Sequence, residues 1–243
     1  MKFMKYFVLF LLCLLIFSCS MKQSMGIQLD GSGDVVFKVV LEKVFVQYIM
    51  DLAEATMDYD DVSELEKKAV FDIGEISSRL RERTGVVLEK INSLDRGQLE
   101  LQFKFEHINE LLYPQDSPVK RSNLVSFSDE NGVKNFRINL TKSNYDHLFE
   151  LFPSLKNPVF ESLAPQPGED VSREEYRDVI EFAMDTPGLI ALDRSSLDLW
   201  ISVQGQILSH VGGEQEGSKL HYTIPLIDLV VLEKPVVLEV KFK

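Results

Sequence analysis

The sequence contains very little cysteine. Its only two cysteines, Cys13 and Cys19, both lie within the first nineteen residues. From residue 20 onward there is no thiol, which excludes a disulfide, a cysteine-ligated zinc site and a cysteine nucleophile from that part of the chain. If this part is exported to an oxidising compartment, its fold must therefore be stabilised by its hydrophobic core without cross-links.

The sequence also lacks the short motifs of common catalytic sites. It has no Gly-x-Ser-x-Gly elbow, no His-Glu-x-x-His pair and no phosphate-binding loop. Because these motifs place nucleophiles, metals and phosphates, we predict no catalytic residue, no metal and no cofactor. The leading prediction is therefore a protein that is not an enzyme, with a hydrolase of unrecognised site as the weakest alternative.

Histidine is scarce as well, with four residues in the chain. His210 and His221 lie equally far from the centre of a glycine-rich loop, so a symmetric hairpin would make them cross-strand neighbours about 5 Å apart. Two interpretations stay open. The pair could share a metal with Glu214 or Glu216, or both could be half-exposed strand residues.

Basic residues are outnumbered by acidic ones. Lys and Arg total 26 against 38 Asp and Glu, which gives a formal net charge of -12 at pH 7. Such a field repels phosphate backbones and anionic lipid surfaces. We therefore expect no nucleic acid partner and no membrane attachment through surface charge.

The apolar run at the N-terminus is too short to cross a bilayer. Phe7 to Phe17 spans eleven residues, whereas a transmembrane helix needs about 20. Lys2 and Lys5 give it a basic head, and this arrangement is typical of a secretory signal peptide.

The four residues Ile16-Phe17-Ser18-Cys19 follow this run and resemble the lipobox of bacterial lipoproteins. An aliphatic residue stands three places before the cysteine and a small residue directly before it. The resemblance implies that residues 1–18 are removed as a signal peptide and that Cys19 carries the lipid. Phe17 is bulkier than the usual Ala or Ser, so an uncleaved anchor and a signal peptide cut elsewhere remain alternatives.

A lipid on Cys19 determines where the protein is expected. Acyl chains such as palmitate would hold it to the cell membrane or the outer membrane, with the domain facing the periplasm or the cell surface. Ser20 stands where some bacteria read an Asp as an inner-membrane retention signal, which favours the outer membrane. Residues 19–26 are predicted to be a short polar tether.

Residues 27–243 are predicted to form a single α+β domain. The chain is 45% hydrophobic, which is typical of a globular core. Alternation of apolar and polar residues, together with turn signals such as Asn131-Gly132, predicts strands. These strands are expected over 27–41 (a hairpin), 86–91, 99–105, 124–128, 136–140, 197–203, 206–211, 218–224 and 236–242.

Helical spacing predicts the remaining elements. Helices are expected over 43–57, 62–83 and 108–113, and residues 141–196 are expected to form a helical block inserted before the C-terminal strands. Within that block a capping box, Ser172 with Glu175, begins a helix that Thr186-Pro187-Gly188 ends. Its buried stripe is predicted to contain Tyr176, Val179, Ile180 and Ala183. The expected architecture is a mainly antiparallel curved sheet of about eight strands packed with helices.

Residues 197–242 resemble the C-terminal signature of the LppM-like bacterial lipoproteins. The matching segments are the strand Leu199–Val203, Gly205–Leu208, the glycine-rich turn from Gly212 to Gly217, the strand Lys219–Ile224 and the closing run Pro235–Phe242. Gln204 stands where the family often has Pro. The resemblance implies a helix-grip-like fold in which a curved sheet and helices enclose an apolar cavity, and hence a lipid-like ligand.

Large aromatic residues are the candidates for the wall of such a cavity. They are Phe103, Phe105, Tyr145, Phe149, Phe152 and Trp200. For each of them a place in a packed core is the alternative. The leading hypothesis is thus a membrane-anchored lipoprotein that binds a lipid or other apolar ligand in the cell envelope. The alternative is a scaffold that docks a partner envelope protein through its acidic surface or block 141–196.

Overall fold

The computed structural model describes residues 20–56, 70–112, 123–147 and 170–243. The predictions for the signal peptide and for the lipid on Cys19 lie outside these residues. So do the predictions for 57–69, 113–122 and 148–169.

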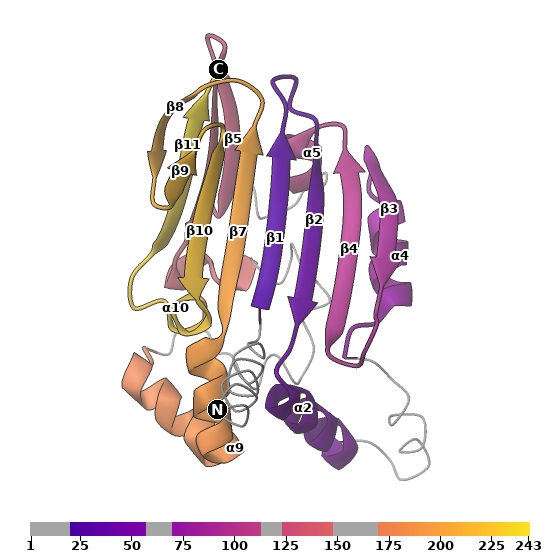
Figure 1. Cartoon of the computed structure of the whole chain (residues 1–243), viewed down its shortest axis with the longest axis vertical. Helices are drawn as coiled ribbons and strands as arrows, with labels where there is room; N and C mark the ends of the chain where they lie inside the picture. The colour runs from indigo at the N-terminus through magenta and orange to yellow at the C-terminus, as the bar shows by residue number, and fades with distance from the viewer. Residues whose placement is uncertain (1–19, 57–69, 113–122, 148–169) are drawn as a thin grey trace, which may run out of the picture.

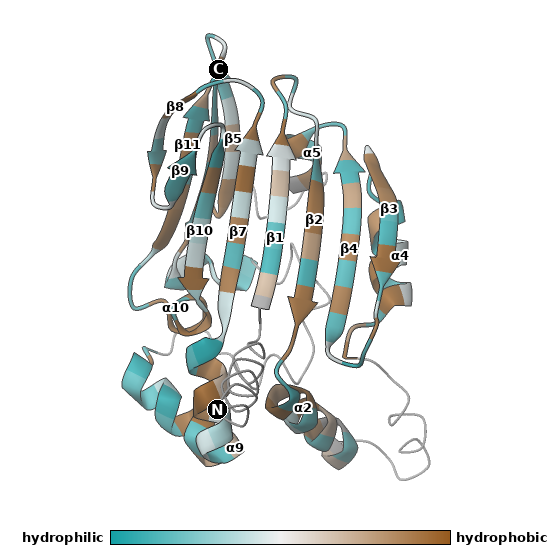
Figure 2. Ribbon diagram, viewed as in Figure 1, coloured by the Kyte–Doolittle hydropathy of each residue, from teal (hydrophilic) through white to brown (hydrophobic). Residues whose placement is uncertain are grey.

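A seven-stranded sheet forms the centre of the molecule (Figure 1). Its strands, in spatial order, are β3 (Val86–Asn92), β4 (Gln98–Phe105), β2 (Gly33–Val40), β1 (Ser20–Ile27), β7 (Ser196–Val203), β10 (Lys219–Pro225) and β9 (Glu214–Glu216). Neighbouring strands are antiparallel except for β1 and β7, which run parallel. Figure 2 shows the alternation of hydrophilic and hydrophobic residues along β4, which follows from one face being buried and the other exposed to solvent.

The segment predicted to be a tether is instead the central strand β1. Each of its eight residues has a partner on β2 and another on β7. The polar composition of this segment did not predict a strand. Lys22 and Ser24 are polar because they face solvent, while Met25 and Ile27 are buried on the other face. The described part of the domain therefore starts with this strand, at Ser20, the residue directly after Cys19.

A second sheet of four strands was not expected. In spatial order it contains β5 (Val125–Glu130), β6 (Val133–Leu140), β11 (Val236–Phe242) and β8 (Ile207–Val211). The prediction of one curved sheet of about eight strands is therefore wrong, whereas the α+β class and the mainly antiparallel pairing are confirmed. The predicted hairpin turn at Asn131-Gly132 is confirmed too, since both residues have the positive φ angles that such two-residue turns require, 55° and 79°.

The two sheets share one hydrophobic core. Its fully buried members include Ile201 and Leu220 from the larger sheet and Phe136, Val240 and Phe242 from the smaller one. Among the described residues, side chains on the opposite face of the seven-stranded sheet, such as Lys22, Ser24 and Lys38, are exposed to solvent. The core thus lies between the two sheets, and we call the other face of the larger sheet the open face.

Five helices and one short 3-10 helix are assigned among the described residues. They are α2 (Lys43–Thr56), α4 (Ile73–Arg81), α5 (Ile108–Leu112), η1 (Lys142–Asn144), α9 (Arg173–Arg194) and α10 (Leu226–Val231). Residues of α2, α9 and α10 form a second buried cluster, which includes Phe45, Tyr176, Ile180 and Ile227. In the described part of the chain, no helix combines the length and the apolarity needed to span a membrane.

Two helices differ from their predicted bounds. α4 begins only after Asp72, whose carboxylate accepts a hydrogen bond from the Glu75 N–H at 2.9 Å. α9 begins at the predicted Ser172–Glu175 capping box but runs on to Arg194. A kink at Asp185 (φ 53°, ψ -166°) makes Pro187 a first-turn residue of the second helical half, where proline is tolerated.

Candidate functional site

The aromatic residues predicted to line one cavity lie in different places. Phe103 and Phe105 are buried on β4 in the main core. Tyr145, just after η1, packs against the same cluster, and burial raises the pKa of its phenol. Phe149 and Phe152 lie outside the described residues. The structure therefore places Phe103, Phe105 and Tyr145 at one core.

Trp200 does not share that core with Phe103 and Phe105. Its neighbours Leu199 and Ile201 are buried, so the two-residue period of β7 turns Trp200 to the opposite, solvent-facing side of the sheet. Its partners in register are Ser24 on β1 and His221 on β10. This alternation was visible in the sequence.

His221 stacks on Trp200 on the open face of the sheet. The ring centroids are 4.1 Å apart and the ring planes differ by 10°. Asp198 lies beside the stack, with its Oδ1 3.5 Å from His221 Nε2 and accepting a hydrogen bond from Thr223 Oγ1 at 3.0 Å. These contacts hold the imidazole in a fixed orientation.

The predicted pairing of His210 with His221 is wrong. β8 leaves the seven-stranded sheet and pairs with β11, so His210 lies opposite Val240 while His221 lies opposite Trp200 and Glu214. The loop between the two histidines is therefore not a symmetric hairpin. Within the described ranges, no group of three or more His, Cys, Asp or Glu side chains is arranged to hold a metal ion.

The open face also carries a network of paired charges. The Glu100 carboxylate forms ion pairs with Lys38 Nζ at 2.8 Å and with Lys90 Nζ at 2.5 Å. The hydrogen bonds from these two lysines lower the pKa of the Glu100 carboxyl to about 2. Lys104 pairs with Glu89, and this hydrogen bond raises the pKa of the lysine. Because both signs alternate across neighbouring strands, the network presents no strong field to a ligand of either charge.

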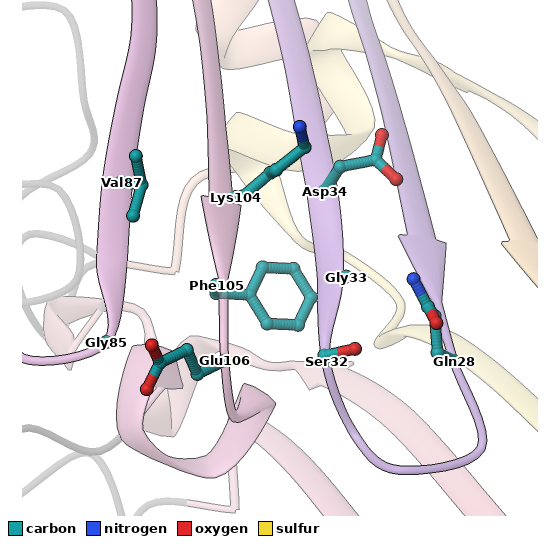
Figure 3. A pocket seen from close by; sticks show the side chains of 9 residues that line it. All are labelled: Gln28, Ser32, Gly33, Asp34, Gly85, Val87, Lys104, Phe105 and Glu106. Carbon is teal, nitrogen blue, oxygen red and sulfur yellow. The ribbon is translucent and has the colours of Figure 1, made fainter.

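A surface pocket of about 300 Å³ lies at one end of the seven-stranded sheet, beside the loop that connects β1 and β2 (Figure 3). It is lined by Gln28, Ser32, Gly33, Asp34, Gly85, Val87, Lys104, Phe105 and Glu106. The Phe105 ring points at Gly33 and is only 3% exposed. The walls carry Asp34, Lys104 and Glu106, so the pocket offers charged groups of both signs beside the apolar side chains of Val87 and Phe105.

Helix α9 exposes two apolar side chains. Phe182 is 94% exposed and Val179, one turn earlier, is 53% exposed. The predicted buried stripe is therefore wrong for Val179, while Tyr176 and Ile180 are buried as expected. Helical spacing missed Phe182 because it identifies the face that packs, and Phe182 lies off that face.

Two ion pairs involve α9. Arg177 pairs with Asp193 across the kink within the helix, and Arg173 pairs with Asp228 of α10 at 3.1 Å. The exposed Phe182 thus lies on a helix whose other side packs in the second buried cluster.

Comparison with known proteins gives one structural similarity. No family model matches the sequence, and no curated protein matches it significantly. The folded domain of the Mycobacterium tuberculosis protein LppM, solved by NMR, is similar over 94% of this chain and 93% of its own, with a TM-score of 0.40 and 10% identity. A similarity at this level does not place the chain in the LppM-like family.

Proposed function

We propose that the protein is a lipoprotein of the cell envelope, anchored through acyl chains on Cys19. The observation that carries this proposal is the start of β1 at Ser20. Cleavage between Ser18 and Cys19 removes the basic and apolar head and leaves the whole seven-stranded sheet. A signal peptide cut further along would remove part of β1, which is the central strand and is hydrogen-bonded on both sides.

Replacing the proposed lipid acceptor tests the anchor. We expect the Cys19→Ala variant to move from the membrane fraction to the soluble fraction, because no acyl chain can then be attached. Cys13→Ala is the matched control and should stay with the membrane, since Cys13 belongs to the removed segment. The N-terminal peptide of the wild-type protein should begin at an acylated Cys19 by mass spectrometry. A membrane-bound Cys19→Ala protein would contradict the proposal.

The proposed role of the folded domain is non-enzymatic contact at the envelope. The support comes from α9, which belongs to the helical block predicted as a docking surface and exposes Phe182 and Val179 over a packed cluster. Exposed apolar side chains that lie together on a surface can mark an interaction site. We therefore favour the interaction role over a ligand cavity in the sheet.

A lipid-like ligand is the second proposal. Its support is that Phe103, Phe105 and Tyr145 border one core. It predicts that native mass spectrometry of the detergent-solubilised protein, purified from its own envelope, finds an additional lipid mass beyond the acyl chains on Cys19. A protein that carries only its covalent lipid would count against the ligand and leave the anchor intact.

A further inference from the structure

The end of the sheet at which β1 begins is also where three helices join it. Ser20 pairs with Val40 and with Ser196, and Ser196 pairs with Pro225. From these partners the chain passes into α2, out of α9 and into α10, respectively. The helices of the second cluster are therefore grouped around the point where the anchor enters the fold.

These helices extend past that point. In Figure 1, α2 and α9 lie beyond the end of the sheet at which β1 begins, on the side away from the β1–β2 loop. Because β1 starts at Ser20, no residue is left to act as a spacer after Cys19. A bilayer that holds acyl chains on Cys19 must therefore lie close to the helices.

The surface of α9 suits the interfacial layer of a bilayer. Phe182, at 94% exposure, has an aromatic ring almost entirely in solvent, and Val179 lies beside it at i-3. Aromatic rings are enriched at the headgroup level of membranes. On a free surface the same ring would order water at an energetic cost.

The charges around Phe182 restrict the kind of lipid. Asp178, Glu181 and Asp185 flank it along the helix. These carboxylates repel anionic headgroups, so contact must depend on the anchor and on apolar insertion rather than on charge. Zwitterionic lipid is the surface that fits.

We propose that α9 is a membrane-contact helix: in the anchored protein, Phe182 and Val179 insert into the interface of a zwitterionic bilayer. This inference rests on the proposed lipid anchor at Cys19 and names the bilayer itself as the partner of the exposed helix. It also orients the domain, with the β1–β2 loop and the pocket of Figure 3 directed away from the membrane.

Tryptophan fluorescence tests the contact because Trp200 is the single tryptophan of the chain. The natively lipidated Trp200→Phe/Phe182→Trp double variant is reconstituted in phosphatidylcholine vesicles with brominated acyl chains. The control is Trp200→Phe/Val87→Trp, since Val87 is 57% exposed near the opposite end of the sheet. We expect the Phe182→Trp reporter to shift to the blue and lose most of its emission, and the Val87→Trp reporter to keep its emission.

Each other outcome overturns the inference in a recognisable way. If the Phe182→Trp reporter is unquenched while mass spectrometry shows an acylated Cys19, the anchor stands and the membrane contact is wrong. If the emission of the Phe182→Trp reporter shifts to the blue only in native membranes and not in the vesicles, α9 is covered by a protein and not by lipid. Quenching of both reporters would mean that no defined face meets the bilayer. An unmodified Cys19 removes the inference together with the proposed function. Circular dichroism of each variant checks folding.

Discussion

Phe242→Ala should lower the free energy of unfolding by about 3–5 kcal/mol, the usual cost of removing a buried aromatic ring from a core. Phe242 is 0% exposed and lies on β11 in the cluster that both sheets share. The ring cannot be replaced by water because its neighbours are apolar. Urea-induced unfolding in the Cys19→Ala background, followed by circular dichroism, measures the loss.

Phe182→Ala is the matched control for this prediction. It removes the same ring from a site that is 94% exposed, so the free energy of unfolding should change by no more than about 0.5 kcal/mol. Equal losses for the two variants would show that Phe182 belongs to the folded core in solution. That result would also remove the basis for a contact role of α9.

Gly33→Ala is expected to destabilise the protein by about 3 kcal/mol, at the upper end of the range for overpacking. Gly33 begins β2 and pairs with Ile27 and Phe105. A Cβ atom at this position would lie 2.0 Å from the carbonyl oxygen of Gly26 and 2.5 Å from Phe105 Cζ. The first is backbone of the central strand and the second is a buried ring, so neither can move without breaking pairing or packing.

Gly217→Ala is the control that separates the steric overlap at position 33 from the cost of a strained backbone conformation. Gly217 has a φ of 63°, yet a Cβ atom there would meet nothing within 4 Å. Only the cost of the left-handed conformation remains, which is about 1–2 kcal/mol. Urea unfolding should therefore rank Gly33→Ala as the more harmful variant. The reverse order would mean that the start of β2 relaxes more easily than its contacts suggest.

Local signals in the sequence predicted local structure well. The Ser172–Glu175 capping box, the Asn131-Gly132 turn and the alternation over 99–105 each satisfy backbone groups or bury one face within a few residues, so the pattern alone is sufficient. The division of strands between two sheets could not be predicted in this way. Alternation shows which face of a sheet a side chain lies on, but it does not show which strand is the neighbour. β8 pairs with β11, which follows later in the chain, and no local pattern indicates this pairing.

The place of Trp200 could have been predicted from the sequence. Alternation with Leu199 and Ile201 was enough to separate Trp200 from the core, yet size and aromaticity grouped it with Phe103 and Phe105. β1 was missed for a different reason. A central strand is held by its backbone hydrogen bonds to two neighbours, so its solvent face can be as polar as a linker.

The parallel pairing of β1 with β7 also imposes an order of events in time. β1 is synthesised before the other described strands, but its partner on one side ends at Val203. Contacts between segments so distant in sequence form slowly, because a long loop must close first. The large sheet therefore cannot close until the chain has been synthesised at least as far as this partner strand. A chain held at its N-terminus during that interval would fold against the surface to which it is attached.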